Sequence, residues 1–137
     1  MNEPETIEAM LGDGPGRTIA VVGLSDNPAK PSYYVSEYMQ QRGYKIYPVN
    51  PAVESVLGEK SYASLSELPV KPDIVNVFRL PKAIPPIVDE MLALGLKNIW
   101  VQQGIVNLEA AARAEQGGIH VVMDRCIMVE HRRHCGR

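Results

Sequence analysis

The chain has 137 residues, of which 45% are hydrophobic and 22% charged, and its formal net charge is −2. These values are typical of a single globular domain and exclude a disordered segment, a collagen-like fibre and a small disulfide-stapled protein. The weak negative charge also argues against a nucleic-acid partner, because such proteins usually carry a basic excess.

The amino-terminal segment, residues 1–17, is acidic and lacks the basic and apolar regions of a signal or transit peptide. A short helix is expected within it, over Thr6–Leu11. No run approaches the ~20 apolar residues of a membrane span. The two cysteines, Cys126 and Cys135, are too few for a secreted disulfide scaffold. We therefore expect a cytoplasmic protein with no membrane partner, in which residues 18–137 form the domain.

From residue 18 onwards, short apolar runs rich in β-branched residues alternate with stretches of helical periodicity. The first kind is typical of strands buried in a parallel sheet, and the second of helices that cover such a sheet. In chain order, the expected elements are a strand at 18–23, a helix at 32–42, a strand at 45–50, a short edge strand near 60–62, a helical turn at 64–69, a strand at 73–78, a helix from 84 that ends at Gly95, a strand at 98–101, a helix at 108–115, a strand at 119–123 and a terminal helix at 126–134.

This alternation predicts an α/β fold, a single Rossmann-like domain with a doubly wound parallel sheet. One irregularity is expected at Pro48, which cannot donate to a neighbouring strand, so its strand should end or bulge there. Such sheets bind ligands at the carboxyl ends of their strands, where the strand order reverses. Four loops should line one crevice, and they follow Gly23, Asn50, Phe78 and Val101.

The first loop connects a strand to a helix, so its backbone N–H groups and the helix N-terminus can receive a phosphate. Ser25 adds a hydroxyl group and Lys30 a positive charge. The loop matches neither GxGxxG nor GxxxxGK[ST], and an ordinary connection with an Asn-Pro turn is the alternative. Its place after the first strand favours phosphate binding. The candidate ligand-binding residues here are Gly23, Leu24, Ser25, Asp26 and Lys30.

The other three loops carry fewer candidates. NAD enzymes place an acidic residue after the second strand, whereas this chain has Asn50 and Pro51, which suit adenine or simply form a turn. Phe78 places an aromatic ring at the rim, and Arg79 can pair with a phosphate or with a surface carboxylate. Gln102 and Gln103 provide two amides, and Gly104 a flexible backbone, for a polar ligand chain; Gln103 and Gly104 are the candidate ligand-binding residues.

Taken in order, five short motifs resemble the CoA-binding domain family, small proteins similar to the CoA-binding domain of the succinyl-CoA synthetase alpha subunit. The motifs are Val-Val-Gly-Leu-Ser at 21–25, Pro-Val-Asn-Pro at 48–51, Phe-Arg at 78–79, Trp-Val-Gln-Gln-Gly at 100–104 and Met-Asp-Arg-Cys at 123–126. The resemblance implies coenzyme A or an acyl-CoA as the ligand. It implies a diphosphate near Ser25, adenine near Asn50 and Pro51, phosphate contacts from Lys30 and Arg79, and a pantetheine arm that runs toward Gln103 and Gly104.

The larger ligases with this domain use a phosphorylated histidine in a second domain, for which 137 residues leave no room. Binding without catalysis is therefore the preferred interpretation, with Asp124 as the single candidate for proton transfer. No metal site is expected in the tail, because Arg132 and Arg133 would repel a cation near His131 and His134. A small NADP-dependent oxidoreductase and a CoA-responsive protein that signals to a partner remain alternatives. A homodimer through apolar residues 127–129 is also open.

Overall fold

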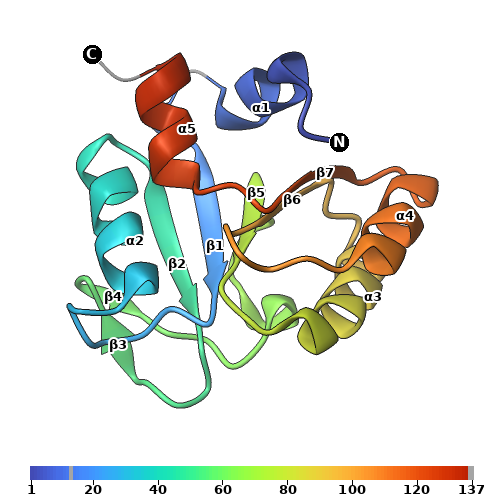
Figure 1. Ribbon diagram of the computed structural model, residues 1–137. Helices are drawn as coiled ribbons and strands as arrows, with labels where there is room; N and C mark the ends of the chain where they lie inside the picture. The colour runs from blue at the N-terminus through green and yellow to red at the C-terminus, as the bar shows by residue number, and fades with distance from the viewer. Residues whose placement is uncertain (13, 136–137) are drawn as a thin grey trace.

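Five parallel strands form one sheet between two layers of helices in the computed structural model, which describes residues 1–12 and 14–135 (Figure 1). Adjacent strands are parallel throughout. This arrangement confirms the doubly wound α/β fold. The strands, in their order across the sheet, are β2 (Lys45–Val49), β1 (Thr18–Val22), β5 (Ile74–Val77), β6 (Asn98–Val101) and β7 (His120–Met123).

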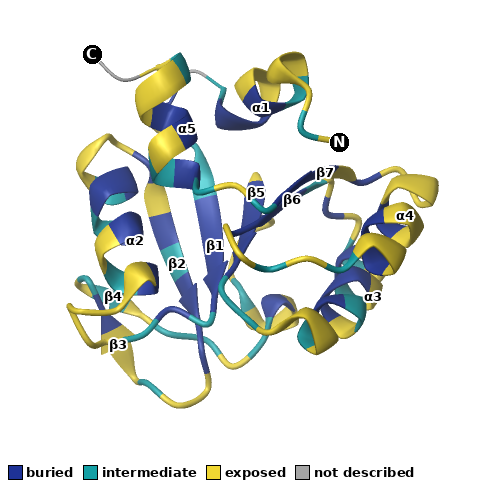
Figure 2. Ribbon diagram, viewed as in Figure 1, coloured by how far each residue is buried: buried dark blue, intermediate teal, exposed yellow. Residues whose placement is uncertain are grey.

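The helices divide between the two faces of the sheet, as Figure 1 shows. One face carries α1 (Pro4–Leu11), α2 (Pro31–Gln41) and α5 (Ile127–His134), and the other carries α3 (Ile84–Leu94) and α4 (Leu108–Gln116). Because strand side chains alternate, each face has its own cluster of buried apolar residues. The central strands are accordingly buried along almost their whole length (Figure 2).

Short elements complete the chain beside β2. The strands β3 (Ser55–Val56) and β4 (Glu59–Lys60) form an antiparallel hairpin, and Tyr62 makes a parallel bridge with Val49. The edge strand expected near residues 60–62 is therefore split between these two pairings. Two 3-10 turns, Leu65–Glu67 and Pro81–Ala83, precede β5 and α3 respectively.

The expectation that the second strand ends or bulges at Pro48 was wrong. β2 continues through Pro48 to Val49, and Pro48 lies in register with Val21 of β1. The reason is that β2 is an edge strand and the backbone of Pro48 points away from β1. Its carbonyl oxygen accepts a hydrogen bond from the Tyr62 N–H at 3.0 Å, so no hydrogen bond to β1 is lost.

The amino-terminal segment packs on the domain. Ile7, Met10 and Leu11 of α1 are buried, so the helix expected over Thr6–Leu11 begins earlier, at Pro4, and contributes to the core. Tyr44 fixes the end of α1, because its hydroxyl donates to the carbonyl of Leu11 at 2.8 Å. Burial raises the pKa of Tyr44 to about 12, so it stays a neutral donor.

The edge of β7 is covered by a side chain rather than by a strand. The Asn2 amide donates to the carbonyl of Met123 and accepts from its N–H, both at 2.8 Å. Such pairing occupies groups that an edge strand otherwise leaves open. Within the described residues, no helix combines the length and the apolar character needed to cross a bilayer.

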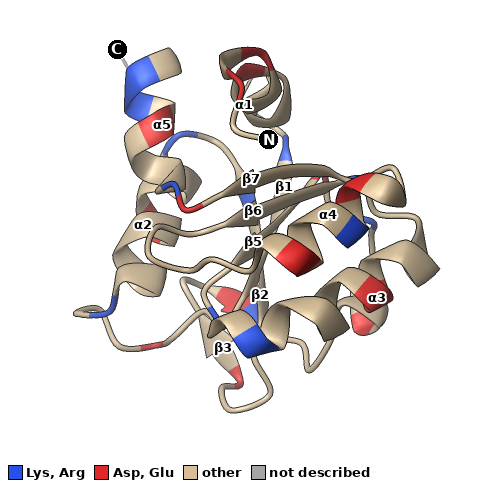
Figure 3. Ribbon diagram, turned by 45° about the vertical axis from the view of Figure 1, so that its right-hand side comes forward, with Lys and Arg blue, Asp and Glu red and all other residues tan. Residues whose placement is uncertain are grey.

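The last helix joins the two ends of the chain. The positive charge of α5 lies at its carboxyl-terminal end, at Arg132 and Arg133. The acidic residues of α1 lie near that end (Figure 3). His134 contacts Glu8 of α1 at 2.9 Å and the buried Glu130 at 3.4 Å. Of the apolar residues at 127–129, only Val129 is exposed, so these three residues do not form an apolar surface.

The contact between α2 and α5 is expected to weaken as the pH falls. His131 is buried, its Nδ1 lies 2.9 Å from the Tyr38 hydroxyl, and its ring packs edge-on against Tyr38 and Tyr44. Burial, and then the positive charge of Arg42, lowers the pKa of His131 below its usual 6.5. The unfolded chain therefore binds a proton that the folded chain does not. The stabilising contribution is complete above about pH 6.5 and declines as the pH falls through and below that value.

Urea unfolding of the wild type and of His131→Phe between pH 7.5 and 5 tests this. The difference in unfolding free energy between the two proteins should shrink as the pH falls. His120→Gln, which changes an exposed histidine, serves as the control. A constant difference between the wild type and His131→Phe would contradict the prediction.

Candidate functional site

The strand order reverses between β1 and β5, because the chain passes from β1 to β2 on one side and returns to β5 on the other. At the carboxyl-terminal edge of the sheet, a hollow of about 480 Å³ opens between the first turns of α2 and α5. This volume lies within the ~300–1,000 Å³ that small-molecule sites usually have. The residues that line it are Pro31, Tyr34, Val35, Phe78, Gln102, Gln103, Gly104, Ile105, Cys126 and Met128.

The first and third loops touch at Gly23. Its φ is +90°, and a Cβ at this position would lie 2.7 Å from the carbonyl oxygen of Phe78 and 3.1 Å from Nε of Arg79. Because real Cβ atoms do not approach backbone oxygens that closely, only glycine fits here. Gly23, Phe78 and Arg79, predicted as site residues from separate loops, therefore lie together at the point of strand reversal.

Hydrogen bonds within the first loop fix its shape. The hydroxyl oxygen of Ser25 accepts from the Asn27 N–H at 3.0 Å, and the Ser25 N–H donates to the Ser32 hydroxyl at 2.9 Å. Leu24 is fully buried, so its side chain belongs to the core, whereas Asp26 is exposed. Ser32 was not predicted from the sequence, although serine near a helix start is a common partner for loop N–H groups.

The N-terminus of α2 is open to an anion. The residue before it, Lys30, is exposed and makes no capping hydrogen bond, Pro31 follows, and the first turn has no acidic residue. Helix N-termini attract negative charge. Within residues 1–12 and 14–135, neither Lys30 nor Arg79 forms an ion pair. Two unpaired cations and an uncapped helix thus adjoin the hollow.

Asn50 joins the first two loops. Its amide nitrogen donates to the carbonyl of Leu24 at 3.0 Å, and its amide oxygen accepts from the Ala52 N–H at 2.9 Å. Both ends of the buried side chain are therefore bonded within the protein. Pro51, the next residue, is exposed beyond this junction. Asn50 holds the loops together, and Pro51 provides the free surface beside it.

The fourth loop is held by Asp124. The carboxylate accepts a 2.7 Å hydrogen bond from the Gly104 N–H, and Asp124 itself has a φ of +61°. Gln103 and Gly104 are both exposed at the hollow. The residue considered for proton transfer is thus bonded to the loop beside the hollow and does not line the hollow itself.

The contact between Gln102 and the start of α5 was not predicted from the sequence, which indicated only an amide suited to a ligand. Gln102 is 4% exposed, and its side-chain oxygen accepts from the Ile127 N–H at 3.1 Å, which caps the start of α5. Nothing in the sequence separates its role from that of the neighbouring Gln103, because the partner lies 25 residues away. Both glutamines line the hollow, but the oxygen of the buried Gln102 also holds the start of α5, whereas Gln103 is exposed.

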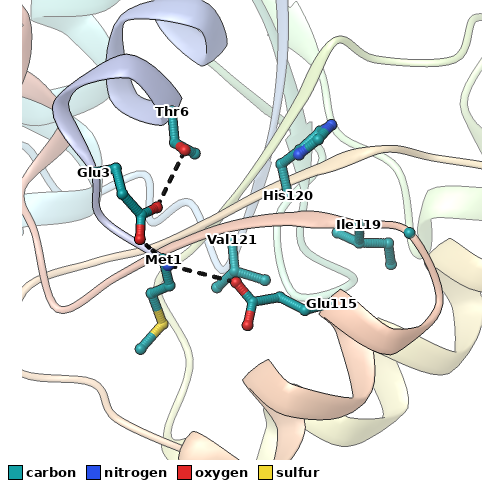
Figure 4. A pocket seen from close by; sticks show the side chains of 8 residues that line it. Met1, Glu3, Thr6, Glu115, Ile119, His120 and Val121 are labelled. Carbon is teal, nitrogen blue, oxygen red and sulfur yellow. Dashed lines mark hydrogen bonds and ion pairs between the residues drawn. The ribbon is translucent and has the colours of Figure 1, made fainter.

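A second hollow, of about 220 Å³, lies beside the amino-terminal end of β7 (Figure 4). Its charged groups satisfy one another, because the Met1 amino group lies 2.7 Å from Glu3 and 3.6 Å from Glu115. The hydrogen bond to Glu3 raises the pKa of that amino group. This hollow lies at the end of the sheet opposite to the four loops, and its amino group and two carboxylates are already paired with one another.

Metal ligation has no support in the part of the chain that the structure describes. No three His, Cys, Asp or Glu side chains there are grouped as ligands would be. His134, one of the candidates in the tail, instead contacts Glu8 and Glu130.

Comparisons with known proteins agree with this geometry. A family model described as a CoA binding domain matches residues 17–132. The uncharacterized protein YneT of Bacillus subtilis is 46% identical over 115 residues, which cover 84% of this chain and 85% of that protein. The solved structure of cell-free ID.343 from Thermus thermophilus is 39% identical, with a TM-score of 0.89, and covers 96% of this chain and 98% of that chain.

A longer relative shares part of the same region. The alpha subunit of an ADP-forming acetate–CoA ligase II from Pyrococcus furiosus is 34% identical over 86 residues. The match covers 62% of this chain but 19% of that subunit.

Proposed function

The chain belongs to the CoA-binding domain family, and from this membership we propose that it binds coenzyme A or an acyl-CoA without transforming it. One observation carries the proposal: where the strand order reverses, positively charged groups without an ion-pair partner among the described residues lie next to a hollow. Lys30, Arg79 and the uncapped start of α2 suit phosphates, and the hollow suits an extended chain. Two free cysteines are consistent with a reducing, cytoplasmic compartment.

The proposed pose follows the loops in turn. The diphosphate lies along the first loop, beside Gly23 and Ser25, within reach of Lys30 and Arg79. Adenine packs against exposed Pro51 on the second loop. The pantetheine arm enters the hollow past Phe78 and bonds to the side chain of Gln103 and to the backbone carbonyl of Gly104, whose N–H is engaged by Asp124. In this pose the two cations, which form no ion pair among the described residues, meet the phosphates, and Asn50, whose amide is engaged, makes no contact with the ligand.

The absence of catalysis is proposed from the groups around the hollow. Its lining has no carboxylate, imidazole or amine that would act as a general acid or base. The nearby Asp124 carboxylate is occupied by the Gly104 N–H. The Cys126 thiol also lines the hollow, but no lining residue is a base that would accept its proton, so we propose binding alone.

Isothermal titration with CoA, dephospho-CoA, NAD and NADP tests the proposal. CoA should bind with measurable heat. An affinity for dephospho-CoA that is about tenfold or more weaker would place the 3′-phosphate at a cation of the site, because a charged hydrogen bond contributes ~1.5–3 kcal/mol. No heat with CoA would overturn the proposal. Preferential binding of NADP would point instead to an oxidoreductase.

Two substitutions of Asp124 separate positioning from proton transfer. Asparagine retains an oxygen for the Gly104 N–H and tolerates a positive φ, so Asp124→Asn should bind CoA within about threefold of the wild type. Alanine loses the hydrogen bond and is strained at this φ. Asp124→Ala should therefore lose about 2 kcal/mol of stability and bind CoA about tenfold more weakly.

Urea unfolding and titration of the two variants provide the measurement. Equal and large losses for asparagine and alanine would show that the negative charge, and not the hydrogen bond to Gly104, is what matters.

A further inference from the structure

One side of the hollow is mostly apolar, so it offers few hydrogen-bond partners to the polar groups of CoA. The polar groups of the hollow are concentrated on the fourth loop, at the side chains of Gln102 and Gln103 and the backbone of Gly104, although the Gln102 oxygen and the Gly104 N–H are already bonded within the protein. The side contributed by α2 and α5 is mostly apolar: Val35 is buried, Met128 is half-buried, and Tyr34 is exposed and carries a hydroxyl group. Phe78 and Ile105 extend this apolar wall.

A pantetheine arm carries two amides and a hydroxyl group, and a buried amide needs hydrogen-bond partners. These partners are concentrated at the fourth loop, so the arm should run along that loop. The sulfur end of the ligand then lies against the mostly apolar side of the hollow, which α2 and α5 form. A surface of this kind is stabilised when it is covered by further hydrocarbon, since removing apolar area from water is favourable.

We propose that this apolar wall holds the acyl chain of a CoA thioester, so that the preferred ligand is an acyl-CoA with a short to medium uncharged aliphatic chain. The inference rests on the proposed function and specifies the ligand of the same site. No cation lines the hollow, so an acyl group that ends in a carboxylate would lose its hydration without a partner. The first N–H of α5 is also unavailable to such a group, because Gln102 accepts from it at 3.1 Å.

The thioester is expected to remain intact in this position. No imidazole, carboxylate or amine lines the hollow to activate water. The site therefore holds an acyl-CoA without hydrolysing it.

Titration of the full chain with CoA, acetyl-CoA, butyryl-CoA and succinyl-CoA tests this inference. Each added methylene should strengthen binding about fourfold, so butyryl-CoA, with two more methylenes, should bind about fifteenfold more tightly than acetyl-CoA. Succinyl-CoA, whose acyl group has the same number of carbons as butyryl, should bind at least tenfold more weakly than butyryl-CoA. Equal affinities for all four ligands would overturn the inference and leave the proposed function standing. A failure of CoA itself to bind would overturn the proposed function.

Two variants on α5 test whether the apolar wall of the hollow contacts the acyl chain. Met128 lines the hollow, whereas its neighbour Val129 is 38% exposed and lies outside it. Met128→Gln keeps a similar length but replaces the apolar end with an amide. It should reduce the ratio of butyryl-CoA to acetyl-CoA affinity to about one half or less of the wild-type ratio, and Val129→Gln should leave that ratio unchanged. An unchanged ratio in Met128→Gln would contradict the placement of the acyl chain.

Discussion

Replacing Gly23 by alanine is expected to abolish measurable CoA binding and to lower the free energy of unfolding by about 3 kcal/mol. Two effects combine at this position. The φ of +90° is strained for any residue with a Cβ, and that Cβ would lie 2.7 Å from the Phe78 carbonyl oxygen. Relief of the clash moves the first loop away from the third. This movement separates Lys30 from Arg79, the two side chains proposed to bind phosphate.

Gly118 provides a matched control for the backbone strain. Its φ is +88°, but no atom lies within 4 Å of its Cβ position, and it lies at the opposite end of the sheet. Gly118→Ala should cost about 1 kcal/mol of stability and leave CoA affinity unchanged. Chemical unfolding and titration compare the two variants. If Gly23→Ala bound CoA as well as Gly118→Ala, the junction of the first and third loops would not form the phosphate site.

The fold could be predicted from the sequence because periodicity reports burial directly. The run after Thr18 is continuous and apolar, and the run after Asp73 is apolar except for Asn76, which is the pattern of strands covered on both faces. Pro48 shows the limit of such reasoning. Whether a proline disrupts a strand depends on which side of the strand faces a neighbour, and the strand order that decides this is a property of the whole sheet.

The four loops of the site could be placed from the sequence, but the role of each side chain could not. Asn50 and Asp124 carry groups that suit a ligand or a reaction, yet their hydrogen bonds go to Leu24, Ala52 and Gly104. These partners become visible only when distant loops lie side by side. A polar residue at a strand end therefore indicates the edge of the crevice and not a particular contact.

The helical wall of the hollow was absent from the predicted site. Tyr34, Val35 and Met128 come from the first turns of α2 and α5, where an apolar residue is normally counted as core. Their exposure to the hollow follows from the spacing between the two helices. Sequence periodicity describes each helix alone and contains no information on this spacing.

Replacing Arg79 by alanine is expected to weaken CoA binding by about 10- to 100-fold with little change in stability. Arg79 is half-buried against Gly23 and has no ion-pair partner among the described residues, so its removal breaks no internal contact of that kind. Charged hydrogen bonds to phosphate contribute ~1.5–3 kcal/mol, which corresponds to this loss of affinity. Lys97→Ala removes the same charge at an exposed residue directly before the amino-terminal end of β6, at the edge of the sheet opposite the four loops, and should leave affinity unchanged.

The comparison with dephospho-CoA decides which phosphate Arg79 binds. Because Arg79 packs on the Gly23 turn, where the first loop begins, we expect it to contact the diphosphate. The loss caused by Arg79→Ala should then be equally large for CoA and dephospho-CoA, whereas Lys30→Ala should affect whichever phosphate lies at the start of α2. A loss seen with CoA and not with dephospho-CoA would place Arg79 at the 3′-phosphate. Equal binding by Arg79→Ala and the wild type would exclude the third loop from phosphate recognition and leave the charge of Lys30 and the N-terminus of α2 as the anion site.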